Sequence, residues 1–413
     1  MASYESKILS ARYAKPDAHG SLAMPVYHAA AYEFPSAQAM ADAFCGRSPA
    51  HSYSRISNPT VQQLERRVQQ ATGALSVTAL NTGMAAISHA LMNVASAGLN
   101  IVASPHVFGN SHSLLGDTLT ALGVETRWAD FRDVAEVERQ MDDNTCAVFF
   151  EMITNPQLYV TDLRAISEAA HRHNVPVIAD TTIIPFTVFH APDFGIDIEV
   201  ISSTKYISGG ATSLGGLLID YGRFDWSRAH VAPPLLRRTK RVGPKMAFTA
   251  RLKTELVTNL GSLMSPHAAY MQTLGLETLA LRFDRQASSA LTLARELQHT
   301  AGIVSVNYPG LEDNPYHELA VSQFGPLPGA MLTIDAESRE AAFHLIDHLQ
   351  LVRRATNLFD HRSLAIHPAS TIFALFSEEE RQQMGISQQT IRLSVGLEDP
   401  ADIAADIRQA IGV

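Results

Sequence analysis

The feature that most constrains the fold is an alternation of continuous apolar runs with amphipathic stretches between residues 101 and 219. We predict strands at 101–104, 146–152, 175–179, 198–202 and 216–219, with a helix over 161–174. A strand that is apolar at every position is buried on both faces, which is typical of a parallel sheet covered by helices. The pattern predicts an α/β fold with a mostly parallel central sheet and helices on both faces.

Polar or aromatic residues follow four of these predicted strands. Phe108 comes after 101–104, Asn155 after 146–152, Asp180 directly after 175–179, and Lys205 shortly after 198–202. Ligands of such sheets bind outside the carboxyl ends of the strands. We therefore expect these four residues along one edge of one sheet.

Lys205 closes the segment Ile-Glu-Val-Ile-Ser-Ser-Thr-Lys, residues 198–205. Burial disfavours a charged amine, and the neutral amine is the form that reacts with an aldehyde. The hydroxyls of Ser202 and Thr204 and the glycines at 209, 210, 215 and 216 suit a phosphate. Taken alone, the segment also fits an ordinary solvated loop lysine.

Two further segments are candidates for binding anions. Gly83 and Met84 open an alanine-rich helix, and the free N–H groups of a helix start attract a phosphate, although a simple cap is equally consistent. Arg392 lies inside the apolar run 390–396, where an unpaired guanidinium is costly. Its partner is either a substrate carboxylate or an internal salt bridge, and the sequence leaves both open.

The chain divides into three predicted parts. Residues 1–60 form a weakly periodic arm, in which Tyr53 and Arg55 precede a helix that Asn58 caps and Gly73 ends. With 413 residues the chain exceeds one hydrophobic core, and its character changes near 245. We predict a ligand-binding domain over 61–245 and a smaller C-terminal α/β domain over 246–413, with a long helix at 274–298 and a strand at 329–335.

Composition excludes several classes of function. The net charge of −9 argues against a nucleic-acid or anionic-membrane partner. Two cysteines cannot build a disulfide framework, and no apolar run is long enough to cross a bilayer, so we expect a soluble, cytoplasmic protein. The 17 histidines show no zinc spacing with either cysteine, and we expect no metal site. Dinucleotide, P-loop and nucleophile-elbow motifs are absent from the sequence.

The ordered set of motifs closely resembles the cysteine/methionine-metabolism, or trans-sulfuration, family of pyridoxal-phosphate (PLP) enzymes of fold type I. The resemblance covers nearly the whole chain. It rests on Tyr53-Ser54-Arg55, Thr82-Gly83-Met84-Ala85-Ala86, Asn155-Pro156, Asp180, Ser202-Ser203-Thr204-Lys205 and Arg392-Leu393-Ser394-Val395-Gly396.

The resemblance implies a role for each of these residues. Lys205 is expected to bind the aldehyde of PLP and move protons, Asp180 to pair with the ring nitrogen, and Phe108 to stack on the ring. The remaining cofactor ligands are expected to be Gly83, Met84, Thr182, Ser202 and Thr204, with Tyr53 and Arg55 supplied by the neighbouring subunit of a dimer that usually pairs into a tetramer. Arg392 is expected to bind the carboxylate of an amino-acid substrate, with Asn155 and Ser363 nearby as further substrate-binding residues.

Within the family, Thr212–Gly216 and Ser363–Thr371 resemble the O-acetylhomoserine sulfhydrylase branch. That resemblance implies γ-replacement on O-acetyl-L-homoserine, or a similar activated homoserine, to give homocysteine for methionine biosynthesis. Free sulfide and a sulfur-carrier protein both remain open as donors. The alternative is a γ-lyase acting on a methionine-, cystathionine- or canavanine-type substrate and releasing a 2-oxo acid and ammonia. A non-catalytic binding protein is disfavoured, because it would need neither Lys205 nor Asp180.

Two departures from the family pattern bear on the substrate. Phe108 stands where the family usually has a tyrosine, and it can stack but cannot transfer a proton. Gly210-Ala211 replaces a common glycine–histidine pair and makes the loop after Lys205 less polar.

Overall fold

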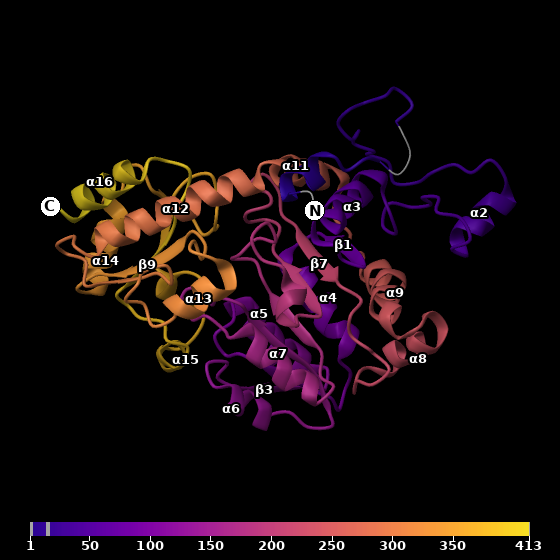
Figure 1. Cartoon of the computed structure of the whole chain (residues 1–413), viewed down its shortest axis with the longest axis horizontal. Helices are drawn as coiled ribbons and strands as arrows, with labels where there is room; N and C mark the ends of the chain where they lie inside the picture. Colours follow the sequence, from indigo (N-terminus) through magenta and orange to yellow (C-terminus); the bar gives the residue numbers. More distant parts are fainter. Residues whose placement is uncertain (1–2, 14–16, 413) are drawn as a thin grey trace.

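A computed structural model describes residues 3–13 and 17–412. Two sheets lie side by side along the long axis of the molecule (Figure 1). All strands of the larger sheet fall within residues 76–220, and all strands of the smaller sheet within 305–394. The α/β fold class predicted from the sequence is confirmed, whereas the domain limits at 60 and 245 stay predictions.

The larger sheet has seven strands in the order β1-β7-β6-β5-β4-β2-β3. Strands β2 to β6 run parallel, and β7 is antiparallel to both of its neighbours. Their bounds are β1 Ser76–Leu80, β2 Asn100–Ala103, β3 Glu125–Trp128, β4 Thr145–Glu151, β5 Val177–Asp180, β6 Ile198–Ile201 and β7 Gly216–Asp220. The five predicted strands therefore correspond to β2, β4, β5, β6 and β7, to within two residues at each end.

Side chains of the larger sheet enter a separate core on each face. Ile198 and Val200 of β6 pack in one core with α4 (Gly83–Val94) and α9 (Ala247–Arg251). Ile201 packs in the other, which contains α7 (Leu163–Arg172) and α3 (Pro59–Thr72). Burial on both faces explains why these strands are apolar at nearly every position.

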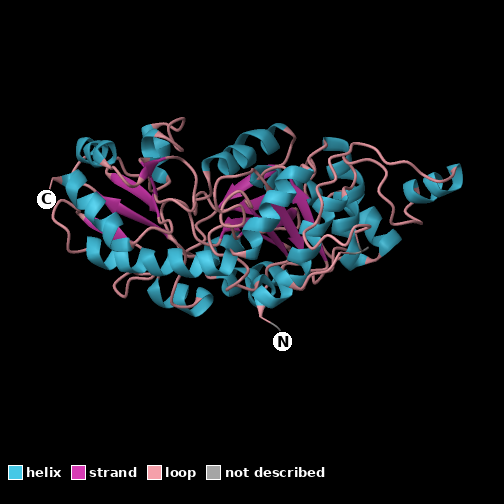
Figure 2. Cartoon of the chain, turned by 90° about the horizontal axis from the view of Figure 1, so that it is seen from above, coloured by secondary structure: helices cyan, strands magenta, loops and turns pink. Residues whose placement is uncertain are grey.

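The smaller sheet has five strands in the order β10-β11-β12-β9-β8, and all pairs except β10 with β11 are antiparallel. Helices α12 (Leu279–Leu297), α14 (Arg339–His348) and α16 (Pro400–Ile411) pack with it. Figure 2 shows α12 as the long helix that runs from this sheet toward the larger one. The strand bounds are β8 Ser305–Asn307, β9 Met331–Asp335, β10 Arg353–Arg354, β11 Leu364–Ile366 and β12 Thr390–Ser394.

The predicted helix over 274–298 is wrong in one respect, because two helices meet within it. Helix α11 (Pro266–Glu277) ends before Thr278, whose ψ of 10° leaves the helical range, and α12 begins at Leu279. Gly275, near the end of α11, lies directly against the backbone carbonyl of Ile207 in the loop after Lys205. No side chain fits between these two segments.

The N-terminal segment is only partly an extended arm. Helix α1 (Tyr4–Leu9) packs on the body of the protein, where Ile8 is fully buried. Helix α2 (Ala37–Phe44) has no buried residue and projects from the end of the molecule opposite the smaller sheet (Figure 1). Arm residues 1, 2 and 14–16 lie outside the described residues. Across the described ranges, no helix is both long and apolar enough to cross a membrane.

Candidate active site

A cavity of about 510 Å³ lies at the carboxyl ends of β4, β5 and β6 and is lined on its other side by Arg392 of β12 and by loop residues near the smaller sheet. Both sheets therefore contribute to one site. Ten of the residues predicted from the sequence line it, namely Gly83, Met84, Phe108, Asn155, Asp180, Thr182, Ser202, Thr204, Lys205 and Arg392.

Lys205 lies in the turn that follows β6, and its Nζ donates to Oδ1 of Asn357 at 3.0 Å. Burial, and then the nearby charge of Arg392, lower the pKa of Lys205 to about 8, against the opposing effect of Asp180. A lysine with this pKa carries a substantial neutral fraction near neutral pH. The neutral amine is nucleophilic and can also accept a proton.

Asp180 ends β5, and its register partner on β4 is Glu151, so two carboxyl groups meet at the wall of the cavity. The N–H of Thr182 donates to Oδ1 of Asp180 at 2.9 Å, and that of Phe108 donates to Oε1 of Glu151 at 2.6 Å. Burial raises the pKa of both groups, and the charge of Asp180 raises that of Glu151 further. Burial of two neighbouring carboxyl groups thus disfavours a negative charge on both at once.

Glu151 was missed by the sequence reasoning. A charged residue that ends a continuous apolar strand on the ligand-binding edge was the available signal. Its carboxylate fixes the backbone of Phe108 and so helps to orient the aromatic ring that lines the cavity.

The start of α4 forms an anion-binding corner of the cavity. The side chain of Thr82 caps the helix by accepting from Ala85 N–H at 3.0 Å, while the N–H groups of Gly83 and Met84 have no intrahelical acceptor. A Cβ on Gly83 would lie 2.7 Å from Cβ of Ser202, so only glycine permits this approach. N–H groups and hydroxyls thus converge on one place, as a phosphate requires.

Arg392 lies in the middle of β12 and is 2% exposed. Nη1 donates to Oδ1 of Asn155 at 3.0 Å, and Nη2 donates to the carbonyls of Thr356 at 3.2 Å and Asn357 at 3.3 Å. Nε has no partner, and none of the ion pairs among the described residues involves this guanidinium. Burial lowers the pKa of Arg392 to about 9, so it stays cationic at neutral pH. Of the two partners considered, the internal salt bridge is not found.

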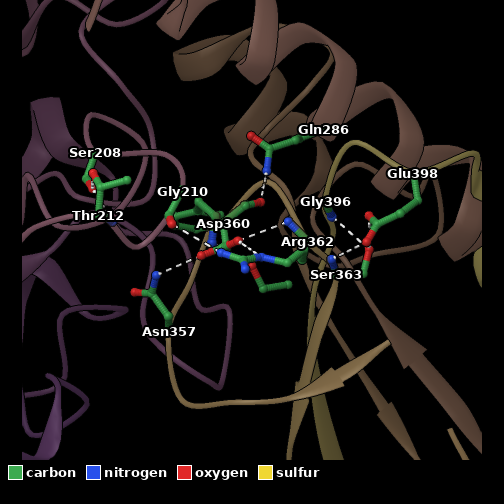
Figure 3. A network of polar contacts seen from close by, with 12 residues as sticks. Ser208, Gly210, Thr212, Gln286, Asn357, Asp360, Arg362, Ser363, Gly396 and Glu398 are labelled. Carbon is green, nitrogen blue, oxygen red and sulfur yellow. Dashed lines mark hydrogen bonds and ion pairs between the residues drawn. The ribbon is translucent and has the colours of Figure 1, made fainter. Parts of the chain in front are cut away.

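Ser363 does not line the cavity, although the resemblance assigned it to the substrate. Its hydroxyl donates to Oε2 of Glu398 at 2.8 Å and accepts from Gly396 N–H at 2.9 Å (Figure 3). The residues of this loop that reach the site are Thr356 and Leu358, which line the cavity, and Asn357, which receives the Lys205 amine. The segment 356–358 of this loop therefore faces the cavity, whereas Ser363 faces Glu398 and Gly396.

The same loop is tied to the segment after Lys205. Arg362 pairs with Asp360 at 2.8 Å and donates through Nη2 to the carbonyl of Gly210 at 3.1 Å (Figure 3). The N–H of His361 donates to the carbonyl of Gly209, whose φ of +75° favours glycine. These contacts hold the lysine-bearing turn against the smaller sheet.

Tyr53 and Arg55 lie away from the cavity of their own chain. Tyr53 is 42% exposed, and the Arg55 guanidinium donates to the carbonyl of Thr258 at 2.5 Å and lies over the Tyr53 ring. Within the described part of the chain, no three His, Cys, Asp or Glu side chains are grouped so as to hold a metal ion.

Comparisons with known proteins agree with this geometry. The chain matches the model of the Cys/Met metabolism PLP-dependent enzyme family over residues 5–412. It is 34% identical to the sulfhydrylase FUB7 of Fusarium oxysporum f. sp. lycopersici over 98% of this chain and 96% of that protein. It is 33% identical to the O-acetyl-L-homoserine sulfhydrylase of Corynebacterium glutamicum over 93% of this chain and 91% of that protein.

A solved structure gives the same answer. A Campylobacter jejuni protein described as an O-acetylhomoserine (thiol)-lyase, which carries N'-pyridoxyl-lysine-5'-monophosphate, superposes with a TM-score of 0.93. The two chains are 34% identical and each is covered completely. Since the family match and the full-length relatives agree with the lysine, carboxylate and anion-binding corner of the cavity, the chain belongs to the Cys/Met metabolism family of PLP-dependent enzymes.

Proposed function

We propose that this enzyme uses PLP to replace the γ-substituent of O-acetyl-L-homoserine, or a similar activated homoserine, with sulfur, giving homocysteine. The observation that carries the proposal is one cavity containing a lysine with a pKa of about 8 and a buried arginine whose Nε has no partner. The first suits an aldehyde cofactor, and the second suits the α-carboxylate of an amino acid. The sulfhydrylase relatives supply the reaction class.

The residues of the cavity fit PLP. The close approach of Gly83 to Ser202 brings the free N–H groups at the start of α4 and the Ser202 hydroxyl together, as a phosphate requires, and Thr204 and Thr182 add hydroxyls to the lining. Asp180 provides a carboxylate for the ring nitrogen, and Phe108 provides an aromatic face. When bound, PLP supplies an electron sink for carbanion chemistry at the substrate.

The protein's own side chains bind and orient the substrate and move protons. Arg392 and Asn155 hold the α-carboxylate, which places the α-carbon on the side of the cavity where Lys205 lies. Lys205, once free of the cofactor, takes the α-proton on its neutral amine and delivers it further along the substrate. Phe108 has no proton to give, so Lys205 or water does the work that a phenol would do.

The active enzyme is proposed to be a dimer with shared sites, paired into a tetramer. The exposed arm, with Tyr53 and Arg55 outside their own cavity, supports a role for these two residues at the phosphate of the neighbouring subunit. Two free cysteines, one of them buried, fit a reducing cytoplasm. Sulfide and a sulfur-carrier protein are both retained as donors.

The test is to incubate the purified PLP-loaded enzyme with O-acetyl-L-homoserine, with and without sulfide, and to quantify homocysteine, 2-oxobutyrate and ammonia. Sulfide-dependent homocysteine with little oxo acid is expected. Oxo acid and ammonia formed regardless of sulfide would replace the proposal with a γ-lyase. No turnover with sulfide would direct the same assay to a carrier-bound sulfur donor.

A further inference from the structure

Glu199 is a buried carboxyl group that the proposed mechanism does not use. It lies in β6, near the middle of the larger sheet, and is fully buried. Its register partners are Ala179 on β5 and Ile219 on β7, both members of an apolar core. A carboxyl group in such a place is expensive unless it is hydrogen-bonded, so its contacts should reveal what it does.

Two hydroxyl groups satisfy the carboxyl of Glu199. Thr181 donates to Oε1 and Tyr221 donates to Oε2, each at 2.5 Å. The ionisable groups that influence it are Tyr221, His190, which lies beyond the Tyr221 ring, and Asp180. Burial raises the pKa of Glu199, and the hydrogen bonds from Thr181 and Tyr221 oppose this shift.

Thr181 connects this carboxyl to the active site, because it directly follows Asp180. Its N–H donates to the carbonyl of Val200, and its hydroxyl points away from the cavity to Glu199. On the cavity side of this turn, Asp180 accepts from Thr182 N–H, and the Thr182 hydroxyl accepts from Ser202 N–H at 2.8 Å. The turn that carries Asp180 is thus held from the cavity side by Thr182 and from the core side by Glu199.

We propose that Glu199 is a positioning residue that fixes, through Thr181, the orientation in which Asp180 meets the ring nitrogen of PLP. The inference rests on the proposed role of Asp180. The carboxyl suits this role, because both of its oxygens accept hydrogen bonds and one of those bonds comes from the residue that follows Asp180. The Tyr221 hydroxyl donates to the other carboxyl oxygen of Glu199, Oε2, and this bond does not involve the turn that carries Asp180.

The test compares two matched single-hydroxyl deletions, Thr181→Val and Tyr221→Phe. Each removes one hydrogen bond to the same carboxyl, but only Thr181→Val cuts the connection to Asp180. The readouts are the dissociation constant of PLP from the apoenzyme and the ¹⁵N chemical shift of PLP labelled at its ring nitrogen. Thermal unfolding of both apoenzymes checks that the variants are folded.

Thr181→Val is expected to weaken PLP binding about three- to tenfold, as for the loss of one hydrogen bond, and to move the ¹⁵N signal toward that of an unprotonated ring. Tyr221→Phe is expected to leave the PLP dissociation constant and the ¹⁵N shift unchanged, even if the variant unfolds at a lower temperature. Glu199→Ala, which removes both acceptor oxygens, should resemble Thr181→Val.

Equal effects of Thr181→Val and Tyr221→Phe on the ¹⁵N signal, or none from Thr181→Val, would overturn the inference and leave Glu199 a purely structural group. The variant Asp180→Asn distinguishes a failure of this inference from a failure of the proposed role of Asp180. If Asp180→Asn leaves the ¹⁵N signal unchanged, the proposed role of Asp180 itself fails.

Discussion

The two sheets build their halves of the cavity in different ways. The larger sheet presents side chains where its strands end, and the contacts there include very local ones, such as that between Asp180 and Thr182, two residues apart. The smaller sheet presents Arg392 from the middle of a strand, and its contact with Asn155 joins residues 237 positions apart. The contacts within the larger-sheet half therefore join residues that are closer in the sequence, whereas the smaller-sheet half depends on how the two sheets are held together.

We also expect the two halves of the cavity to have different roles. The larger-sheet half should govern cofactor attachment and chemistry, and the smaller-sheet half should govern substrate affinity. Substitutions in each half can test whether these functions are as separate as the architecture suggests.

The largest effect is expected from Lys205→Ala in the larger-sheet half. It removes both the amine that binds PLP and the proton carrier, so turnover should fall by at least about 10³-fold. Borohydride reduction followed by peptide mass analysis should find no pyridoxyl group on the variant. Lys245→Ala, an exposed lysine elsewhere, is the control, and substantial turnover in Lys205→Ala would refute the proposed chemistry.

Arg392→Leu should produce the next largest effect and should confine it to the substrate. Losing a buried, charge-assisted carboxylate contact costs about 2–4 kcal/mol, which is roughly 30- to 1000-fold in kcat/KM. Arg392→Lys should recover only part of this, because it cannot bind bidentately. The PLP absorbance should persist in both variants. Arg353→Leu, exposed on β10 of the same sheet, is the matched control, and a loss of cofactor instead of substrate affinity would break the comparison.

The pH dependence of cofactor attachment should report the Lys205 environment. Because its pKa is lowered to about 8, the rate at which apoenzyme links to PLP should rise about tenfold per pH unit below 8 and level off above it. A midpoint above about 10, as for an exposed lysine, would contradict the burial of this amine.

The same shift has a consequence for stability. Between about pH 8 and 10.4 the unfolded lysine holds a proton that the folded one lacks, so the apoenzyme should gain stability from this group as pH rises through that window. Lys205→Met should lose this contribution, and the difference between the two stability curves isolates it.

Ser363→Ala should give the smallest effect on catalysis. Its hydroxyl bonds Glu398 and Gly396 outside the cavity, so we expect a loss of about 1–2 kcal/mol in unfolding free energy and no change in KM for O-acetyl-L-homoserine. Chemical denaturation and steady-state kinetics measure the two quantities. A severalfold rise in KM with unchanged stability would return Ser363 to the substrate site.

These regional differences explain what could be predicted from the sequence. Asp180 and Lys205 follow buried strands in the sequence, so the rule for strand ends placed them at once in the cavity. Glu151 escaped because it belongs to a strand that reads as continuous and apolar. Arg392 was recognised as a buried cation, but only the fold could show that its neighbours are carbonyls and an amide, not a carboxylate.

The loop at 356–363 was the least predictable part of the site. Its residues are held at the cavity by Arg362 and by the N–H of His361, which donate to the carbonyls of Gly210 and Gly209, more than a hundred positions away. The helical periodicity near 278 was likewise misleading, because Thr278 interrupts it where α11 must pass the turn after Lys205. Contacts of this range leave no periodic signal in the sequence.

Helix α12 has a consequence for how such an enzyme can change. Near its start the Arg282 guanidinium donates to the Gly275 carbonyl and lies against Gly209, and one turn later Gln286 donates to the carbonyls of Asp360 and Val395. One helix thus contacts both the loop that follows Lys205 and the end of the strand that carries Arg392, so it links the positions of the amine and the guanidinium. A mutation that tilts this helix would shift Lys205 and Arg392 together. We therefore expect a change of substrate to come first from the apolar side chains that line the cavity, and not from a change in the distance between Lys205 and Arg392.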